Sequence, residues 1–263
     1  MLPTLVLVHG AWMSPASWQP WIDRYSARGY RVVAPSWPHD EREVAALVAS
    51  PDPALAEVGV TEIVDHYQAE IGKIDGPVVL IGHSFGGLFV QMLLDRGVGV
   101  AGVAIDPAPP KGVFPSASAL KAGLPALFAG PIATLSFGDF QWGWMHTQPE
   151  AEQRAAYDAY VVPTPRKVYR QGAFAPFTDV LRVDFARRTQ PLLLVAGLED
   201  RTVSASMVRA AYKLQRDSKA ITALHEFPGR THWIVGQPGW EEVADDAIGW
   251  VETTLDVHPP AGK

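Results

Sequence analysis

The 263-residue chain contains no cysteine, which excludes disulfide bonds, a thiolate nucleophile and cysteine-based zinc or iron–sulfur sites. A chain without cysteine fits a reducing compartment, and we expect a cytoplasmic protein. The sequence has no block of like charge, and its formal net charge is −6. Because nucleic acids and anionic membrane surfaces attract basic patches, we expect neither a nucleic acid nor a membrane as a partner.

The chain also has no long hydrophobic run at its start. Residues 1–8 are largely apolar but carry no basic segment and are too short to span a bilayer. They predict a first buried strand rather than a signal sequence.

Short runs of valine, isoleucine and leucine alternate with longer helix-like stretches along most of the chain. The expected strands are 5–8, 31–34, 78–81, 100–105, 191–196 and 221–227. The expected helices lie near 17–28, 61–74, 88–96, 204–217 and 240–255. Such alternation is typical of a parallel sheet covered on both faces, so we predict an α/β fold with a mostly parallel, doubly wound sheet.

The alternation stops between residues 107 and 190. This stretch is rich in proline, glycine and aromatic residues, and it contains only short helical pieces such as 151–160. A segment of this length is too long for a plain loop. We therefore predict a core made of residues 1–106 and 191–263, with an inserted helical cap or lid at 107–190.

One glycine pattern is a false signal. Residues 97–102 match G-x-G-x-x-G, but they follow a helix-like stretch and lead into a strand. A dinucleotide-binding fingerprint needs the opposite order, with the strand before it and the helix after it. We interpret the segment as a turn and expect the protein to use no cofactor and no metal.

A serine stands inside a G-x-S-x-G motif, Gly82-His83-Ser84-Phe85-Gly86, between an expected strand and an expected helix. A serine on so sharp a turn has strained backbone angles, and bulk two residues away on either side would collide with it. Its hydroxyl is exposed beside a helix N-terminus, whose N–H groups stabilise negative charge. We predict that Ser84 is a nucleophile; the alternative is a glycine-rich turn with an incidental serine.

A nucleophilic serine needs a general base, and that base needs an orienting acid. Of the eight histidines, only His232 lies in a loop between the last expected strand and the last expected helix. We predict His232 as the base, against the alternative of a surface loop histidine.

For the acid we predict Asp200, which follows the strand 191–196 at turn spacing. Its neighbour Glu199 and Asp106, at the end of the strand 100–105, stay open as alternative carboxylates. A helix-capping role is the other interpretation of Asp200.

An oxyanion hole needs two N–H donors near the nucleophile. One is the backbone N–H of Phe85. The second is predicted at Ala11, because His9-Gly10-Ala11 directly follows the first expected strand. The alternative interpretation of this segment is an ordinary turn.

Taken together, the His-Gly-Ala loop, Gly-His-Ser-Phe-Gly-Gly, Gly-Leu-Glu-Asp-Arg and Thr-His-Trp segments resemble the α/β-hydrolase superfamily, in its serine-nucleophile, esterase- and lipase-like members. The resemblance covers essentially the whole chain. It implies an α/β-hydrolase fold with a cap and a triad of Ser84, His232 and Asp200. The chain starts at what resembles the third strand of the fuller pattern, so the leading antiparallel hairpin is expected to be absent. Members with an aspartate nucleophile are disfavoured because Ser84 fills that position.

We expect a serine hydrolase that cleaves a small to medium hydrophobic ester, lactone or aryl ester through an acyl-enzyme. Its partner is a small hydrophobic substrate, and we expect a monomer or a small homo-oligomer. Aromatic side chains beside the motifs and in the insertion are predicted to bind substrate: Trp12, Trp233, Phe137, Trp142 and Trp144. Two alternatives stay open. One is a non-hydrolytic enzyme on the same fold, such as a hydroxynitrile lyase, a cofactor-free oxygenase or a perhydrolase, and the other is a ligand-binding receptor with a vestigial triad.

Overall fold

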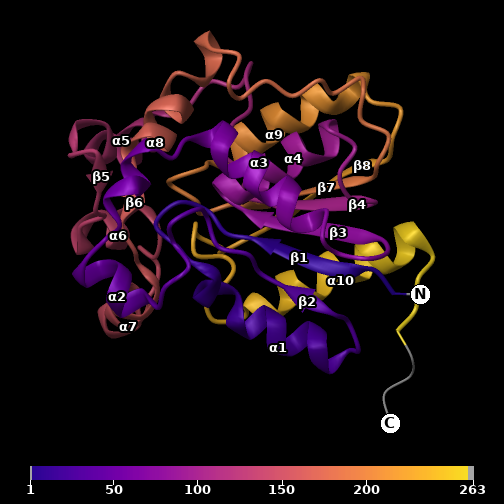
Figure 1. The fold of residues 1–263 in the computed structure, drawn as a ribbon, viewed down its shortest axis with the longest axis horizontal. Helices are drawn as coiled ribbons and strands as arrows, with labels where there is room; N and C mark the ends of the chain where they lie inside the picture. The colour runs from indigo at the N-terminus through magenta and orange to yellow at the C-terminus, as the bar shows by residue number, and fades with distance from the viewer. Residues whose placement is uncertain (1, 260–263) are drawn as a thin grey trace.

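A six-stranded sheet lies at the centre of the computed structural model, which describes residues 2–259 (Figure 1). Its strands are β1 (Thr4–Val8), β2 (Val32–Val33), β3 (Val78–His83), β4 (Ala101–Ile105), β7 (Leu192–Gly197) and β8 (Thr222–Phe227). They lie in the order β2-β1-β3-β4-β7-β8, and every pairing is parallel. The predicted fold class is confirmed, and each strand overlaps a range expected from the sequence.

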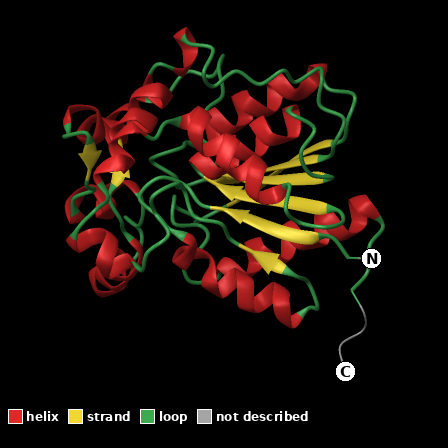
Figure 2. Cartoon of the chain, viewed as in Figure 1, coloured by secondary structure: helices red, strands yellow, loops and turns green. Residues whose placement is uncertain are grey.

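Helices cover both faces of this sheet. The helices α1 (Gln19–Ala27) and α10 (Trp240–Leu255) lie on one face, and α3 (Val60–Ile71), α4 (Phe85–Asp95) and α9 (Ala205–Leu214) lie on the other (Figures 1 and 2). Parallel strands joined by helical crossovers are buried on both faces, and β1, β3, β4 and β7 are accordingly buried along their whole length. Across residues 2–259, no helix is both long enough and apolar enough to cross a membrane.

The segment 107–190 leaves the sheet after β4 and returns at β7, the neighbouring strand. Its helices are α5 (Ala117–Phe128), α6 (Phe137–Gly143), α7 (Glu150–Tyr160) and α8 (Arg166–Ala173), followed by a short 3₁₀ helix, Ala175–Phe177. In Figure 2 these helices lie beyond the arrowheads of the central strands. The insertion therefore stands over the edge of the sheet where the parallel strands end.

Some elements were not expected from the sequence. The insertion contains an antiparallel pair of two-residue strands, β5 (Ile132–Ala133) and β6 (Thr164–Pro165). Outside the insertion, the additional elements are α2 (Val44–Ala49) and a short 3₁₀ helix, Pro53–Glu57. Two further 3₁₀ helices, Pro15–Trp18 and Gln215–Asp217, lie at the ends of helices that were expected. These elements are too short to produce a clear periodic pattern in the sequence.

The chain reverses direction across the sheet at β1, because β2 lies on one side of this strand and β3 on the other. Ligands of open α/β sheets bind in the crevice outside the carboxyl ends of the strands at such a switch point. The loop that carries Ala11 follows β1, and the turn that carries Ser84 follows β3. The sheet topology therefore brings these two predicted site segments side by side.

Candidate active site

Ser84 connects β3 to α4 with φ 56° and ψ −122°, a left-handed backbone conformation that non-glycine residues rarely adopt. Two hydrogen bonds hold the turn. The Ser84 N–H donates to the carbonyl of Ile105 at 2.9 Å, and the Ser84 carbonyl accepts from the N–H of Ala108 at 2.9 Å. The nucleophile position is thereby tied both to the end of β4 and to the start of the insertion.

Glycines around Ser84 allow the backbone segments to come close together. A Cβ atom at Gly82 would lie 2.2 Å from the carbonyl oxygen of Gly86, and one at Gly86 would lie 2.0 Å from that of Val8. The need for glycine at both flanks is confirmed, but the obstacle is backbone rather than the serine itself. The collision with serine arises instead at Gly10, where a Cβ atom would lie 2.8 Å from the Ser84 Cβ.

Three predicted side chains form a hydrogen-bonded chain. The Nε2 atom of His232 lies 3.1 Å from the Ser84 Oγ, and its Nδ1 atom lies 2.6 Å from the Asp200 Oδ2. All three residues are buried. They come from the turn after β3, the loop after β7 and the loop after β8, so the sheet order brings together residues far apart in the sequence.

Backbone N–H groups fix the Asp200 carboxylate. Its Oδ1 accepts from Thr202 at 2.6 Å and from Val203 at 2.8 Å, which leaves Oδ2 for His232. Asp200 thus caps the turn and orients the histidine at once. The alternative acid Glu199 is exposed, whereas the other alternative, Asp106, is fully buried and lies against Asp200.

Burial affects the protonation states of both His232 and Asp200. It lowers the pKa of His232 below its ordinary value, which keeps the imidazole neutral and able to accept a proton. Burial also raises the pKa of Asp200, while the N–H groups of Val203 and Thr202 act in the opposite direction by stabilising its carboxylate. A neutral imidazole between a hydroxyl and a carboxyl is the arrangement that general-base activation of serine requires.

One cluster of metal-type ligands is found among residues 2–259. Ligand atoms of His83, Asp106 and His232 lie within 4.8 Å of one another. Both ring nitrogens of His232 already contact Ser84 and Asp200, so a metal ion here would have to displace one of these contacts. The cluster fits proton chemistry better than metal coordination.

Sequence comparison agrees with this geometry: the profile of the alpha/beta hydrolase family matches residues 5–246. The chain belongs to the alpha/beta hydrolase family. A separate search among proteins of curated function finds no match.

Solved structures of other alpha/beta hydrolases share the fold at low sequence identity. The monoacylglycerol lipase of Paleococcus ferrophilus superposes with a TM-score of 0.68 at 23% identity, over 96% of this chain and 97% of that one. A methylesterase from Arabidopsis gives 0.66 at 11% identity, over 96% and 100%. A tomato methylketone synthase complexed with beta-ketoheptanoate gives 0.66 at 14% identity, over 97% and 99%.

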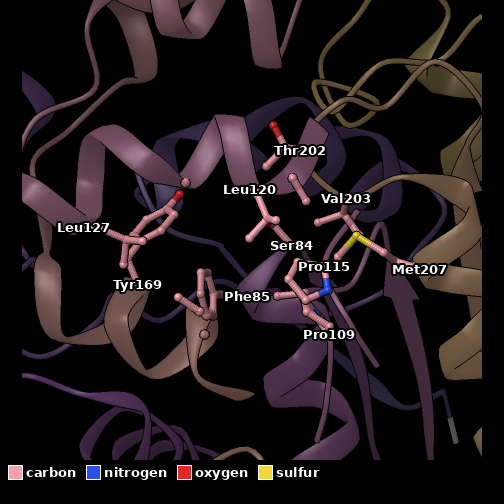
Figure 3. Close-up of a pocket in the computed structure, with 15 residues that line it drawn as sticks. Ser84, Phe85, Pro109, Pro115, Leu120, Leu127, Tyr169, Thr202, Val203 and Met207 are labelled. Atoms are coloured by element: carbon pink, nitrogen blue, oxygen red, sulfur yellow. The ribbon is translucent and has the colours of Figure 1, made fainter. Parts of the chain in front are cut away.

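In this alpha/beta hydrolase, Ser84 borders an open pocket. The empty space of the pocket, including the solvent at its mouth, is about 640 Å³. Figure 3 shows Phe85 and Tyr169 on one side of Ser84 and Val203 and Met207 on the other. The insertion and the sheet loops both contribute to the lining, which is Ser84, Phe85, Ala108, Pro109, Pro115, Ala119, Leu120, Gly123, Leu127, Tyr169, Gly172, Ala173, Thr202, Val203 and Met207. None of these residues carries a charge.

The five aromatic residues predicted to bind substrate are not among the residues that line this pocket. Trp144 and Trp233 are buried in the core, and the Trp144 ring packs edge-on against His232 at 4.5 Å between centroids. Trp12 is also buried, with its ring 5.0 Å from that of Tyr169. Being next to a motif in the sequence did not decide which way these side chains point.

The remaining two, Phe137 and Trp142, lie in α6. The guanidinium of Arg154 lies 3.4 Å from the centre of the Phe137 ring, and the Lys121 ammonium lies 4.0 Å from that of Trp142. These rings are half-buried and pack against cations, which stabilises an aromatic ring at the surface. None of the five residues therefore lines the pocket beside Ser84, and their contact with substrate stays a prediction.

Four of the pocket residues that the sequence analysis missed come from one face of α5. Ala119, Leu120, Gly123 and Leu127 follow helical spacing, and all four line the pocket. Leu120 is nevertheless half exposed, as expected for a helix that covers an open cavity. This periodicity was the available signal, although small residues on a cap helix do not by themselves indicate a pocket.

Proposed function

We propose that this chain is a serine hydrolase that cleaves small to medium hydrophobic esters, including lactones and aryl esters, through an acyl-enzyme. One observation carries the proposal. The Ser84 hydroxyl lies 3.1 Å from a neutral, buried imidazole nitrogen of His232, and Ser84 borders an uncharged pocket. This combination supplies an activated nucleophile at a place where an apolar acyl or alcohol group can bind.

In the proposed reaction, the Ser84 oxygen attacks the carbonyl carbon of the ester while His232 takes the hydroxyl proton. The resulting imidazolium is stabilised by the Asp200 carboxylate, which holds the ring through its Nδ1–H. His232 then gives the proton to the leaving alcohol, and an ester of Ser84 remains. Water, activated by the same histidine, attacks this ester and releases the acid.

The tetrahedral intermediate needs donors for its oxyanion, and we propose the backbone N–H groups of Phe85 and Ala11. In the described part of the chain, neither of these N–H groups has a hydrogen-bond acceptor. The Gly10 position lies against the turn, since a Cβ there would be 3.4 Å from the Phe85 nitrogen. Two free N–H groups beside the nucleophile support an oxyanion hole, and loss of one such donor typically costs about 10²- to 10³-fold in rate.

The pocket supports an apolar substrate class. Its hydroxyl groups come from Ser84, Tyr169 and Thr202, and alanine, glycine, proline and larger apolar residues make up the rest of the lining. A phosphate or a carboxylate would need a cation or several aligned donors to replace its hydration. We therefore propose an uncharged ester as the preferred substrate.

The proposal is tested with purified protein and p-nitrophenyl esters graded by acyl length, together with lactones and amides. We expect turnover of esters, and we expect an organophosphonate probe to add its mass to the peptide that contains Ser84. Ser84→Ala should abolish both, whereas Ser26→Ala, at an exposed site on α1, should leave both unchanged.

Labelled Ser84 without turnover of any ester would contradict the hydrolase proposal while keeping an activated serine. The fold hosts other chemistry, since one structural relative is a methylketone synthase. Cyanohydrin cleavage, peroxide-dependent bromination and ligand binding unaffected by Ser84→Ala would then distinguish the lyase, perhydrolase and receptor alternatives.

A further inference from the structure

Asp106 is a buried carboxyl that the proposed reaction does not use. It directly follows β4, has no exposed surface, and has a positive φ of 39°. Its Oδ1 accepts the Gly197 N–H at 2.7 Å. Its Oδ2 has no donor among the described residues, although it is fully enclosed. A strained residue with an unsatisfied buried oxygen needs an explanation.

The carboxyl group beside Asp106 is that of Asp200, and its charge acts on the pKa of Asp106. Two carboxylates cannot both be ionised side by side in the interior, so the pair holds one proton. The hydrogen bonds decide which group keeps the charge. Asp200 lies against the N–H groups of Thr202 and Val203 and the Nδ1 of His232, whereas Asp106 accepts from Gly197 alone.

We propose that Asp106 is a neutral carboxylic acid whose Oδ2–H donates to the Asp200 carboxylate and thereby holds that carboxylate on His232. This assignment gives the enclosed Asp106 Oδ2 a partner and gives Asp200 another donor. Asp106 is then a positioning residue, because it acts on the reaction through Asp200. The inference rests on the proposed function, since it describes how the same site is held in its reactive form.

Three titratable groups face Asp106, and their states agree with this assignment. Asp200 comes from the loop after β7, His83 from the end of β3 and His232 from the loop after β8. Burial lowers the pKa of both histidines, so neither supplies a permanent cation for a second carboxylate. Burial and the Asp200 charge raise the pKa of Asp106 well above its ordinary value.

The neutral state of Asp106 also limits the charge in the site. With Asp106 protonated, the buried cluster carries a single negative charge, and this charge is neutralised when His232 takes the proton from Ser84. An ionised Asp106 would add a second negative charge that the imidazolium cannot balance. It would also hold the His232 proton more strongly and slow its transfer to the leaving group.

The decisive variant is Asp106→Asn, which is neutral at every pH and has nearly the shape of aspartic acid. Its amide oxygen can accept from Gly197 while its NH₂ group donates to Asp200, so it reproduces the proposed state. We expect the rate of organophosphonate labelling and kcat to stay within about threefold of the wild type. The acid limb of the pH profile should stay at the same pH.

Asp106→Leu removes both the donor and the acceptor. We expect kcat and the labelling rate to fall about 10- to 100-fold, because a hydrogen bond to a charged group is lost, with KM little changed. The acid limb should move to higher pH, since an Asp200 carboxylate with fewer donors holds the His232 proton more strongly. Asp40→Asn, at another buried aspartate, is the matched control and should change none of these readouts.

The inference is overturned if Asp106→Asn loses more than about tenfold in kcat or moves the acid limb to lower pH, because either result shows that wild-type Asp106 is ionised. It is also overturned if folded Asp106→Leu behaves as the wild type. Should the leucine variant not fold, the asparagine variant decides the question. Failure of the proposed function is seen separately, as a wild-type protein that neither labels nor turns over any ester.

Discussion

The sheet side and the insertion use apolar residues in different ways. On the sheet side, large aromatic side chains such as Trp18, Trp21 and Trp37 are completely enclosed. In the insertion, six large apolar residues are exposed, namely Phe114, Leu120, Leu124, Phe128, Phe174 and Phe177. Several of them lie on α5 or beside α8, the two helices of the insertion that line the Ser84 pocket.

The sheet side and the insertion therefore have different roles: one positions the reactive groups, and the other shapes the pocket. The reactive groups stand on strand ends whose register is fixed by a dense core, so their mutual distances are held by many contacts. The part of the pocket lining that the insertion contributes lies largely on α5 and α8, which have few buried residues, so its shape depends on weaker packing. Changes on the sheet side should therefore affect the chemical step, and changes in the insertion should affect which substrates react.

The largest effect is expected on the sheet side, at Asp200. Asp200→Asn should lower kcat by about 10⁴-fold, because the amide no longer stabilises the imidazolium and favours the wrong tautomer of His232. Glu199→Gln, at the exposed neighbour, should change kcat by less than about twofold. Steady-state kinetics of both variants on one ester measure the contrast, and equal effects would show that Asp200 is not the acid.

The pH dependence of the chemical step gives the next largest effect. Below the pKa of His232 the imidazole is protonated and no longer accepts the serine proton, so kcat/KM should fall about tenfold per pH unit. Burial lowers this pKa, and the midpoint should therefore lie below the value of about 6.5 of a free histidine. A profile measured between pH 4 and 8 decides this, and a midpoint at or above 6.5 would show that the Asp200 charge outweighs burial.

A smaller and more selective effect is expected in the insertion. Gly123 lines the pocket, and a Cβ atom there would meet no heavy atom within 4 Å. Gly123→Leu should place its side chain in the pocket and lower kcat/KM for long acyl esters by about tenfold, with little change for acetate esters. Gly138→Leu, in open space on α6, is the matched control, and a uniform loss for all esters would contradict the substrate role of α5.

The smallest effect concerns stability on the sheet side. Asp40 is buried, and burial raises its pKa to about 8. Its protonated form is favoured in the folded state, so wild-type stability is lost as pH rises from the ordinary aspartate value towards 8. Asp40→Asn should therefore raise Tm more at pH 8 than at pH 5. An equal gain at both pH values would contradict this titration.

The sequence predicted the parallel sheet and the Ser84–His232–Asp200 contacts, because strand runs and strand-end motifs are local signals. The pairing of Asp106 with Asp200 was not predicted, although both were considered as acids. Their contact depends on β4 and β7 being neighbours, and sequence alone does not establish strand order. The pocket lining was missed for a related reason, since the directions of Trp144 and Trp233 follow from tertiary packing around His232.

The hydrogen bond from Ala108 to the Ser84 carbonyl has a consequence for building chimeric enzymes. The first residues after β4 support the turn that carries Ser84. Pro107 also packs close to this turn, since a Cβ atom added at Gly87 would lie 3.0 Å from its side chain. A cap exchanged from another protein should therefore be joined after residue 108 rather than directly after the strand. A junction at that point leaves the serine turn intact while the transplanted segment supplies a new substrate range.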